Sequence, residues 1–209
     1  MSNDVIKRVI PGTVEIRKDA EGNETRTIEG YGVVFNKWSS DLGWFKEKIE
    51  RTAFDDVDMS AVIATFNHNF DYVMARSDSN TLKLSVDDYG VKYEFQAPNT
   101  TAGNDLLENV RIGNVKGSSF MFTIDRGGAT WNWTEGDEGL DERTITKIGR
   151  FIEVGPVTNP AYPDTTASAK RDYESAKAEY QKEKQTEQKE AMRSVVDTER
   201  KYKQLRAKI

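Results

Sequence analysis

Apolar and polar residues alternate in short segments through the first 160 residues, and turn-forming residues separate these segments. A period of two is typical of half-buried β-strands. The predicted strands span residues 14–17, 25–35, 61–66, 81–86, 91–96, 115–124, 129–133, 143–148 and 150–157. The first two flank a turn sequence, residues 19–23, and should form a hairpin. Strands spaced in this way favour an antiparallel barrel or sandwich over a parallel sheet.

Two helices are predicted among these strands. One has an N-cap at Thr101 or Asn104, carries leucine and valine at helical spacing, and ends near Gly113. The other has a weaker pattern and covers Lys46–Asp56.

The C-terminal segment, from Thr165 or Thr166 to Ile209, has the pattern of one long helix. Apolar residues recur every three to four positions near both of its ends, but the seam slips by one residue between Tyr180 and Val195. Most residues between these two are polar. Two interpretations therefore stay open: a solvated single helix, or a helix that pairs with a helical partner.

Composition divides the chain at the same place. All 15 glycines and 5 prolines lie at or before Pro163. From residue 168 onward, 12 basic and 8 acidic residues give a net charge of +4, whereas the preceding residues carry 18 basic and 27 acidic residues, a net charge of −9. We therefore predict an N-terminal strand or hairpin region over 1–24, a folded domain over 25–167 and a charged helical tail over 168–209.

Residue counts exclude several kinds of site. The chain has no cysteine, which excludes disulfide frameworks, thiolate zinc sites and cysteine nucleophiles. Its one histidine excludes paired-histidine metal motifs. No apolar run is long enough to cross a bilayer, and the N-terminus lacks the features of a secretory signal, so we expect a cytosolic protein. The acidic first part argues against nucleic-acid binding.

The single histidine, His68, follows a predicted buried strand, and a serine pair lies in another strand. Alternation places Ser118 on the face of Phe120 and places Ser119 on the opposite face. A serine hydroxyl needs a neighbouring base to become a nucleophile. A Ser–His pair is therefore the most economical acyl-transfer machinery that this chain can build, although ordinary strand serines and a structural histidine also fit the pattern.

A third group would fix the tautomer of the imidazole and stabilise its protonated form. Glu153 is a candidate because it lies inside an apolar stretch, residues 151–157. A buried carboxylate needs partners, so Glu153 has either a structural or a functional hydrogen-bonding role.

A series of short motifs follows through residues 25–167. It comprises IEGYGVVFN at 28–36, DLG at 41–43, FKE at 45–47, AF at 53–54, FNHN at 66–69, AR at 75–76, TLKL at 81–84, DYG at 88–90, NTTAG at 99–103, GSSFMF at 117–122, EV at 153–154 and VTNPA at 157–161. In their order and spacing these motifs resemble the prohead proteases of tailed bacteriophages, capsid-maturation serine peptidases that are considered distant relatives of herpesvirus assemblin.

The resemblance implies a role for each candidate residue. Ser119 matches the nucleophile, His68 the general base and Glu153 the acidic member of a catalytic triad. Met121 stands where the family usually has glycine. The implied fold is mainly β (α+β), a closed antiparallel β-barrel of assemblin type with flanking helices and, in this chain, a long C-terminal helix.

The expected protein is a serine endopeptidase that needs no metal or organic cofactor. By resemblance, it would cleave the major capsid protein, its scaffolding segment and itself during prohead maturation. It would be made in the bacterial host cytoplasm and packaged inside the prohead. It could form a homodimer, and its helical tail could pair with another helix. The alternative is a non-catalytic scaffold or capsid assembly chaperone with a degenerate protease fold. A nucleic-acid-binding barrel is the least favoured interpretation.

Overall fold

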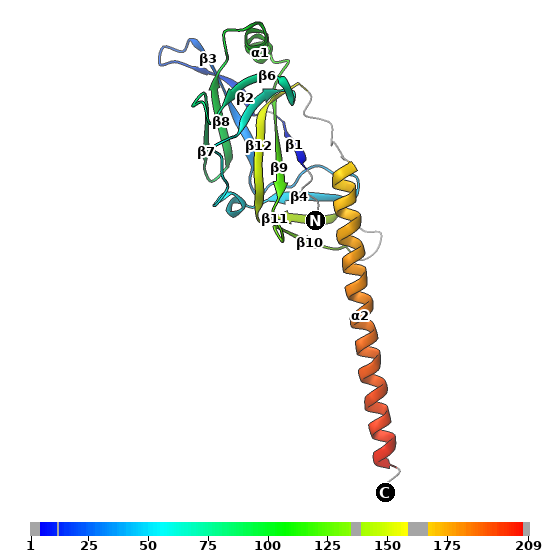
Figure 1. Ribbon diagram of the computed structural model, residues 1–209. Coiled ribbons are helices and arrows are strands. Elements are labelled where there is room, and N and C mark those ends of the chain that lie inside the picture. Colours follow the sequence, from blue (N-terminus) through cyan, green and yellow to red (C-terminus); the bar gives the residue numbers. More distant parts are fainter. Residues whose placement is uncertain (1–4, 12, 135–138, 159–166, 207–209) are drawn as a thin grey trace. The chain divides into compact units, whose positions relative to one another are not determined.

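The computed structural model describes residues 5–11, 13–134, 139–158 and 167–206 (Figure 1). The chain divides into two compact units, Met1–Thr166 and Ala167–Ile209. The first unit contains three β-sheets and the helix α1 (Thr101–Arg111), and the second contains the helix α2 (Ala167–Arg206). The predicted beginning of the tail helix at 165 or 166 and its predicted end at 209 lie outside the described residues.

The strands of the first unit form one five-stranded, one four-stranded and one three-stranded sheet. The five-stranded sheet has the order β1 (Ile6–Ile10), β9 (Gly117–Ile124), β12 (Ile148–Val157), β5 (Ile63–Phe66) and β6 (Asn69–Arg76). The four-stranded sheet has the order β2 (Val14–Lys18), β3 (Glu24–Val34), β8 (Gly90–Gln96) and β7 (Leu82–Val86). The three-stranded sheet has the order β10 (Ala129–Asn132), β11 (Asp141–Ile145) and β4 (Phe45–Ile49).

The predicted closed antiparallel β-barrel is wrong. In the described residues each sheet is open and keeps two edge strands, so the fold is a mixed α+β arrangement. Two strand pairs, β12 with β5 and β11 with β4, are parallel. Alternation along a strand shows which of its faces is buried, but it does not show which strands pair at the edges of a sheet. The sequence pattern therefore could not distinguish a closed barrel from open sheets.

The helix predicted over Lys46–Asp56 is also wrong. The structure has the strand β4 there, followed by a short 3₁₀ helix, η1 (Arg51–Phe54). Burial along β4 alternates with a period of two, and Glu47 is one of the buried residues. Because a buried glutamate counts as polar in the sequence, it hides the alternation that identifies a strand.

The two larger sheets pack against each other around one hydrophobic core. Gly32 of β3 lies so close to Val154 of β12 that an added Cβ would overlap the valine side chain. The helix α1 begins after Thr100, whose side chain accepts a hydrogen bond from the backbone N–H of Gly103. This N-cap lies one residue before Thr101, the first of the two predicted caps. It ends before Gly113, which has the expected positive φ of 78°.

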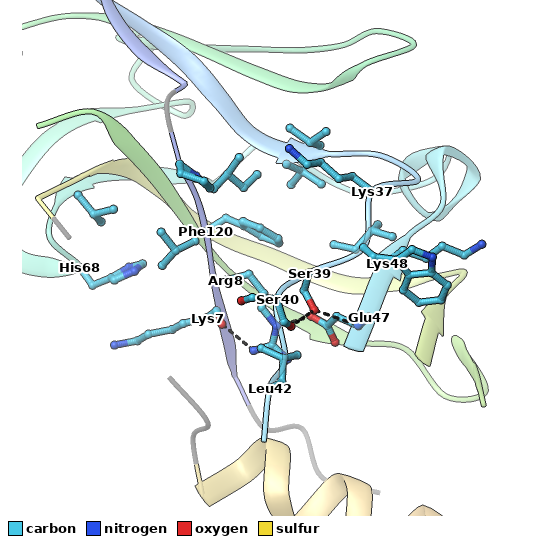
Figure 2. A pocket seen from close by; sticks show the side chains of 18 of the residues that line it. Lys7, Arg8, Lys37, Ser39, Ser40, Leu42, Glu47, Lys48, His68 and Phe120 are labelled. Carbon is cyan, nitrogen blue, oxygen red and sulfur yellow. Dashed lines mark hydrogen bonds and ion pairs between the residues drawn. The ribbon is translucent and has the colours of Figure 1, made fainter. Parts of the chain in front are cut away.

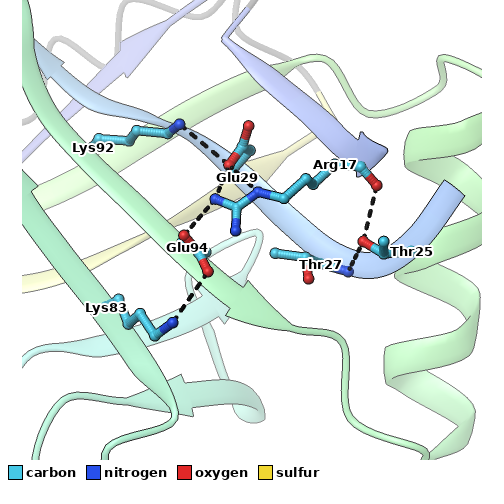
Figure 3. A network of polar contacts seen from close by, with 7 residues as sticks. All are labelled: Arg17, Thr25, Thr27, Glu29, Lys83, Lys92 and Glu94. Atoms are coloured by element: carbon cyan, nitrogen blue, oxygen red, sulfur yellow. Dashed lines mark hydrogen bonds and ion pairs between the residues drawn. The ribbon is translucent and has the colours of Figure 1, made fainter. Parts of the chain in front are cut away.

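A network of charged side chains runs across the four-stranded sheet (Figure 3). Arg17 of β2 pairs with Glu29 of β3 and Glu94 of β8, and Lys92 and Lys83 pair with these two carboxylates. Hydrogen bonds from Arg17 lower the pKa of Glu94, and the two carboxylates raise the pKa of Arg17. Glu29 is buried, but its partner cations Arg17 and Lys92 are partly exposed, so solvent can take over their charges when the carboxylate is removed. The network therefore serves below as a control for a row whose cations are buried.

The helix α2 is described by itself. It has 40 residues, and it exposes Met192, Val195 and Val196. Among the described residues, no helix combines the length and the apolar character that crossing a membrane requires.

Candidate active site

His68 lies in a two-residue turn between β5 and β6. Asn67 and His68 both have positive φ, 55° and 57°, as a type I′ hairpin turn requires. The side-chain oxygen of Asn67 accepts hydrogen bonds from the backbone N–H of Thr158, at 2.9 Å, and from its hydroxyl, at 3.2 Å. The backbone N–H of Asn67 donates to the carbonyl of Pro156 at 3.1 Å. These bonds fasten the turn that carries His68 to the end of β12.

Glu153 lies on β12, and it is 1% exposed. Its Oε1 accepts a hydrogen bond from the Thr65 hydroxyl at 2.5 Å, and its Oε2 lies 2.7 Å from Nδ1 of His68. In the described part of the chain, the only charged or chargeable side chain that pairs with Glu153 is His68. The negative charge of Glu153 is therefore balanced when the imidazole takes up a proton.

Ser119 lies on β9 and is fully buried. Its Oγ lies 2.5 Å from Nε2 of His68, and its hydroxyl donates a hydrogen bond to the backbone carbonyl oxygen of Arg8 at 2.8 Å. With Nδ1–H of the imidazole donating to Glu153, Nε2 of neutral His68 can accept the serine proton once this proton turns away from the Arg8 carbonyl. The structure thus brings all three predicted site residues into one hydrogen-bonded row, Ser119–His68–Glu153.

The neighbouring serine belongs to a different network. The hydroxyl of Ser118 lies 2.9 Å from the hydroxyl of Tyr93 and accepts a hydrogen bond from Thr13 at 2.7 Å. Burial raises the pKa of Tyr93, so its phenol stays neutral. The two serines face opposite sides of β9, as alternation predicted.

Sequence analysis missed Thr65 and Asn67 as parts of this site. Thr65 is a strand residue with no distinguishing motif, and its importance follows only from the parallel pairing of β5 with β12. Asn67 stands next to the histidine, and asparagine tolerates positive φ better than most residues. That preference is the one local signal that could have indicated a tight turn.

The N-terminal strand β1 covers Ser119. It pairs antiparallel with β9, and Val9 stands opposite Ser119. A cavity of about 600 Å³ lies beside β1 and is lined in part by His68, Phe120 and Glu47. In Figure 2, His68 and Glu47 appear on opposite sides of Arg8. The serine is therefore buried beneath a segment of the chain's own backbone, next to a cavity.

The side chain of Arg8 belongs to a second buried row, Arg8–Glu47–Arg143. Oε1 of Glu47 pairs with Arg8, and Oε2 accepts bonds from Nε and Nη2 of Arg143 at 3.0 and 2.5 Å. Burial alone would raise the pKa of Glu47, but attraction to the two guanidinium groups and their hydrogen bonds lower it to about 2. Glu47 is therefore ionised at neutral pH.

The row Ser119–His68–Glu153 has the arrangement that acyl transfer by a serine requires: a nucleophile, a base and a group that orients the base. Comparison with known proteins agrees with this chemistry. The sequence profile of the caudovirus prohead serine proteases matches residues 12–179. The chain belongs to this family of bacteriophage capsid-maturation proteases, as its motifs predicted.

Among solved structures, the chain is similar to the bacteriophage T4 capsid assembly protease. The two share 13% sequence identity, the match covers 74% of this chain and 98% of that one, and the TM-score is 0.42. No curated protein sequence matches the chain.

Proposed function

We propose that this protein is a serine endopeptidase in which Ser119 is the nucleophile, His68 the general base and Glu153 the group that orients His68. The observation that carries the proposal is the hydrogen-bonded row of these three side chains. Its two contacts, 2.5 Å from Ser119 to His68 and 2.7 Å from His68 to Glu153, are short enough for direct proton transfer and for orientation of the imidazole.

In the first half of the reaction, Oγ of Ser119 attacks the carbonyl carbon of the scissile bond, and its proton moves to Nε2 of His68. The carbon–nitrogen bond of the tetrahedral intermediate then breaks, and His68 gives the proton to the leaving amine. In the second half, His68 takes a proton from water, and the resulting hydroxide attacks the acyl carbon. The bond to Ser119 breaks, and His68 returns the proton to Oγ.

Family membership supports substrates among the proteins of the immature capsid. We assign the major capsid protein and its scaffolding segment to this role. The enzyme would be made in the host cytoplasm and would act inside the prohead.

The position of β1 supports self-cleavage as a further activity. The Ser119 hydroxyl donates a hydrogen bond to the carbonyl oxygen of Arg8 at 2.8 Å, which places the Arg8–Val9 peptide bond beside the nucleophile, and β1 pairs with the serine strand as an extended peptide substrate would. Attack at this carbonyl would break the bond between Arg8 and Val9. Departure of the strand would then uncover Ser119.

The test of the proposed function is Ser119→Ala, with Ser118→Ala as the matched control. Each variant is expressed in cells together with the capsid protein, and processing is followed by gel electrophoresis and intact-mass spectrometry. We expect processing to stop in Ser119→Ala and to continue in Ser118→Ala, because Ser118 hydrogen-bonds to Tyr93 on the other face of β9. Processing in both variants would refute the assignment.

For the tail we propose delivery to the prohead. A long helix of mixed charge that exposes apolar side chains suits pairing with a helical scaffold protein. Deleting residues 168–209 should lower the amount of protease found in proheads and leave cleavage of purified capsid protein unchanged. Unchanged packaging would contradict this role.

A further inference from the structure

We propose that Glu47 is the specificity residue of this peptidase: it receives the positively charged group of the substrate residue whose carbonyl lies at Ser119, so that cleavage follows arginine or lysine. The inference rests on the proposed function, because it names the substrate class of the same site. Nothing in the sequence motifs assigns this role to Glu47.

Arg8 shows how one residue reaches both groups. Its carbonyl oxygen lies 2.8 Å from Oγ of Ser119, whereas its guanidinium pairs with the Glu47 carboxylate. The residue that presents its carbonyl to the nucleophile is the one on the acyl side of the scissile bond. The side chain at that position therefore enters the cavity that contains Glu47 (Figure 2).

Glu47 has one carboxylate oxygen fixed by the protein and the other directed at Arg8. Arg143 donates to Oε2 through both Nε and Nη2, and its guanidinium also lies 4.8 Å from the ring of Phe45 and 5.4 Å from that of Trp131. The Glu47–Arg143 pair is thus complete without Arg8. When β1 leaves, Oε1 of Glu47 loses its partner Arg8 and can accept a hydrogen bond from another cationic side chain, while Arg143 keeps Oε2.

The guanidinium group of Arg8 does not have all of its hydrogen-bond donors satisfied. Among the described residues, its Nη2 is a buried nitrogen without a hydrogen-bond partner, although Nη1 donates to the carbonyl of Lys7 at 2.7 Å. A buried donor without a partner destabilises the folded state, which lowers the free energy needed to release the strand. A lysine ammonium would leave no such second nitrogen, so the site also suits lysine.

Charge at the cavity differs between its rim and its interior. Lys37 is exposed and Lys48 half-buried, whereas Glu47 is 3% exposed. Glu47 is the only acidic residue among the described cavity-lining side chains. Because a buried charge is screened far less than an exposed one, the interior carboxylate decides which charge is accepted there.

The experiment follows self-cleavage of the full-length protein. Freshly purified protein is incubated, and intact-mass spectrometry measures the rate at which chains beginning at Val9 appear. We expect wild type and Arg8→Lys to cleave at rates within a few-fold of each other. Arg8→Gln and Glu47→Gln should each cleave about 10- to 100-fold more slowly, the loss expected for one hydrogen bond between charged groups. The double variant should be no slower than the slower single variant, because both changes remove the same interaction.

Two controls keep a folding defect from imitating this result. Glu29→Gln removes a carboxylate from the network of the four-stranded sheet and should leave the rate unchanged (Figure 3). Arg8→Gln leaves Glu47 and Arg143 intact, so its slow cleavage cannot come from loss of that pair. Circular dichroism of each variant checks the fold.

The outcomes separate this inference from the proposed function. Cleavage that depends on Ser119 but is indifferent to Arg8→Gln and Glu47→Gln, or that follows an acidic or apolar residue, overturns the role of Glu47 alone. Absence of any Ser119-dependent cleavage, in the chain itself and in added capsid protein, overturns both.

Discussion

Two buried glutamates of this protein lie in similar surroundings but have different partners. Glu153 is 1% exposed and Glu47 is 3% exposed. Glu153 accepts bonds from a threonine hydroxyl and an imidazole, whereas Glu47 accepts bonds from two guanidinium groups. Glu47 is thus paired with two cations in the intact chain, whereas Glu153 is balanced only when His68 is protonated.

The difference shows how burial can serve stability in one place and chemistry in another. In the intact chain, Arg8 and Arg143 together lower the pKa of Glu47 to about 2, so its carboxylate is charged at neutral pH. A carboxylate whose one chargeable partner is an imidazole stabilises the protonated form of that imidazole. Replacing Glu153 by a neutral residue should therefore mainly lower turnover, whereas replacing Glu47 should also lower the stability of the fold.

The largest effect is expected at Glu153. Glu153→Gln keeps the size of the side chain but removes the charge that stabilises protonated His68, so turnover should fall on the order of 10⁴-fold. Initial rates of capsid-protein cleavage measure this, with Glu29→Gln as the control. A variant that keeps more than a tenth of wild-type activity would show that Glu153 does not orient the base.

The next effect concerns stability at Glu47. Glu47→Ala leaves Arg8 and Arg143 buried without their counter-charge, which should lower the free energy of unfolding by about 3–5 kcal/mol. Urea unfolding is measured in a Ser119→Ala parent, which prevents self-cleavage. Glu29→Ala leaves two cations, Arg17 and Lys92, that are partly exposed to solvent, so it should cost about 1 kcal/mol. Equal losses in both variants would mean that the buried row has no special role in stability.

Acid should weaken the same row. The pKa of Glu47 is lowered from 4.5 to about 2 in the folded protein, so the unfolded chain binds its proton first as the pH falls. The stabilisation is present above pH 4.5 and should be lost between pH 4.5 and 2, on the order of a few kcal/mol. Urea midpoints across this range should fall less steeply in Glu47→Gln than in the Ser119→Ala parent. Parallel curves would contradict the expectation.

The smallest effect is expected at Thr65. Thr65→Val removes the hydrogen bond to Oε1 of Glu153 and should cost about 1 kcal/mol of stability and about tenfold in turnover. Thr65→Ser keeps the hydroxyl and should retain most of both. Equal activity of the valine and serine variants would show that His68 alone positions Glu153.

Several features of the protein were predictable from sequence because they are encoded locally. Period-two alternation predicted most strands of the first unit, capping residues predicted α1, and the family motifs directed attention to His68, Ser119 and Glu153. These signals depend on residues a few positions apart in the sequence, so they can be recognised before the fold is known.

The tertiary structure decided the remainder. Strands β1, β4 and β6 were not among the predicted strands. Strands β1 and β4 each bury a charged residue, Arg8 or Glu47, and such a residue counts as polar in a sequence pattern until its distant partner is known. The sheets proved to be open because pairing between remote strands depends on non-local contacts. Buried charges are tolerated only when folding supplies their counter-charges. For this reason, neither the covering of Ser119 by β1 nor the Arg8–Glu47–Arg143 row could be inferred from the order of residues alone.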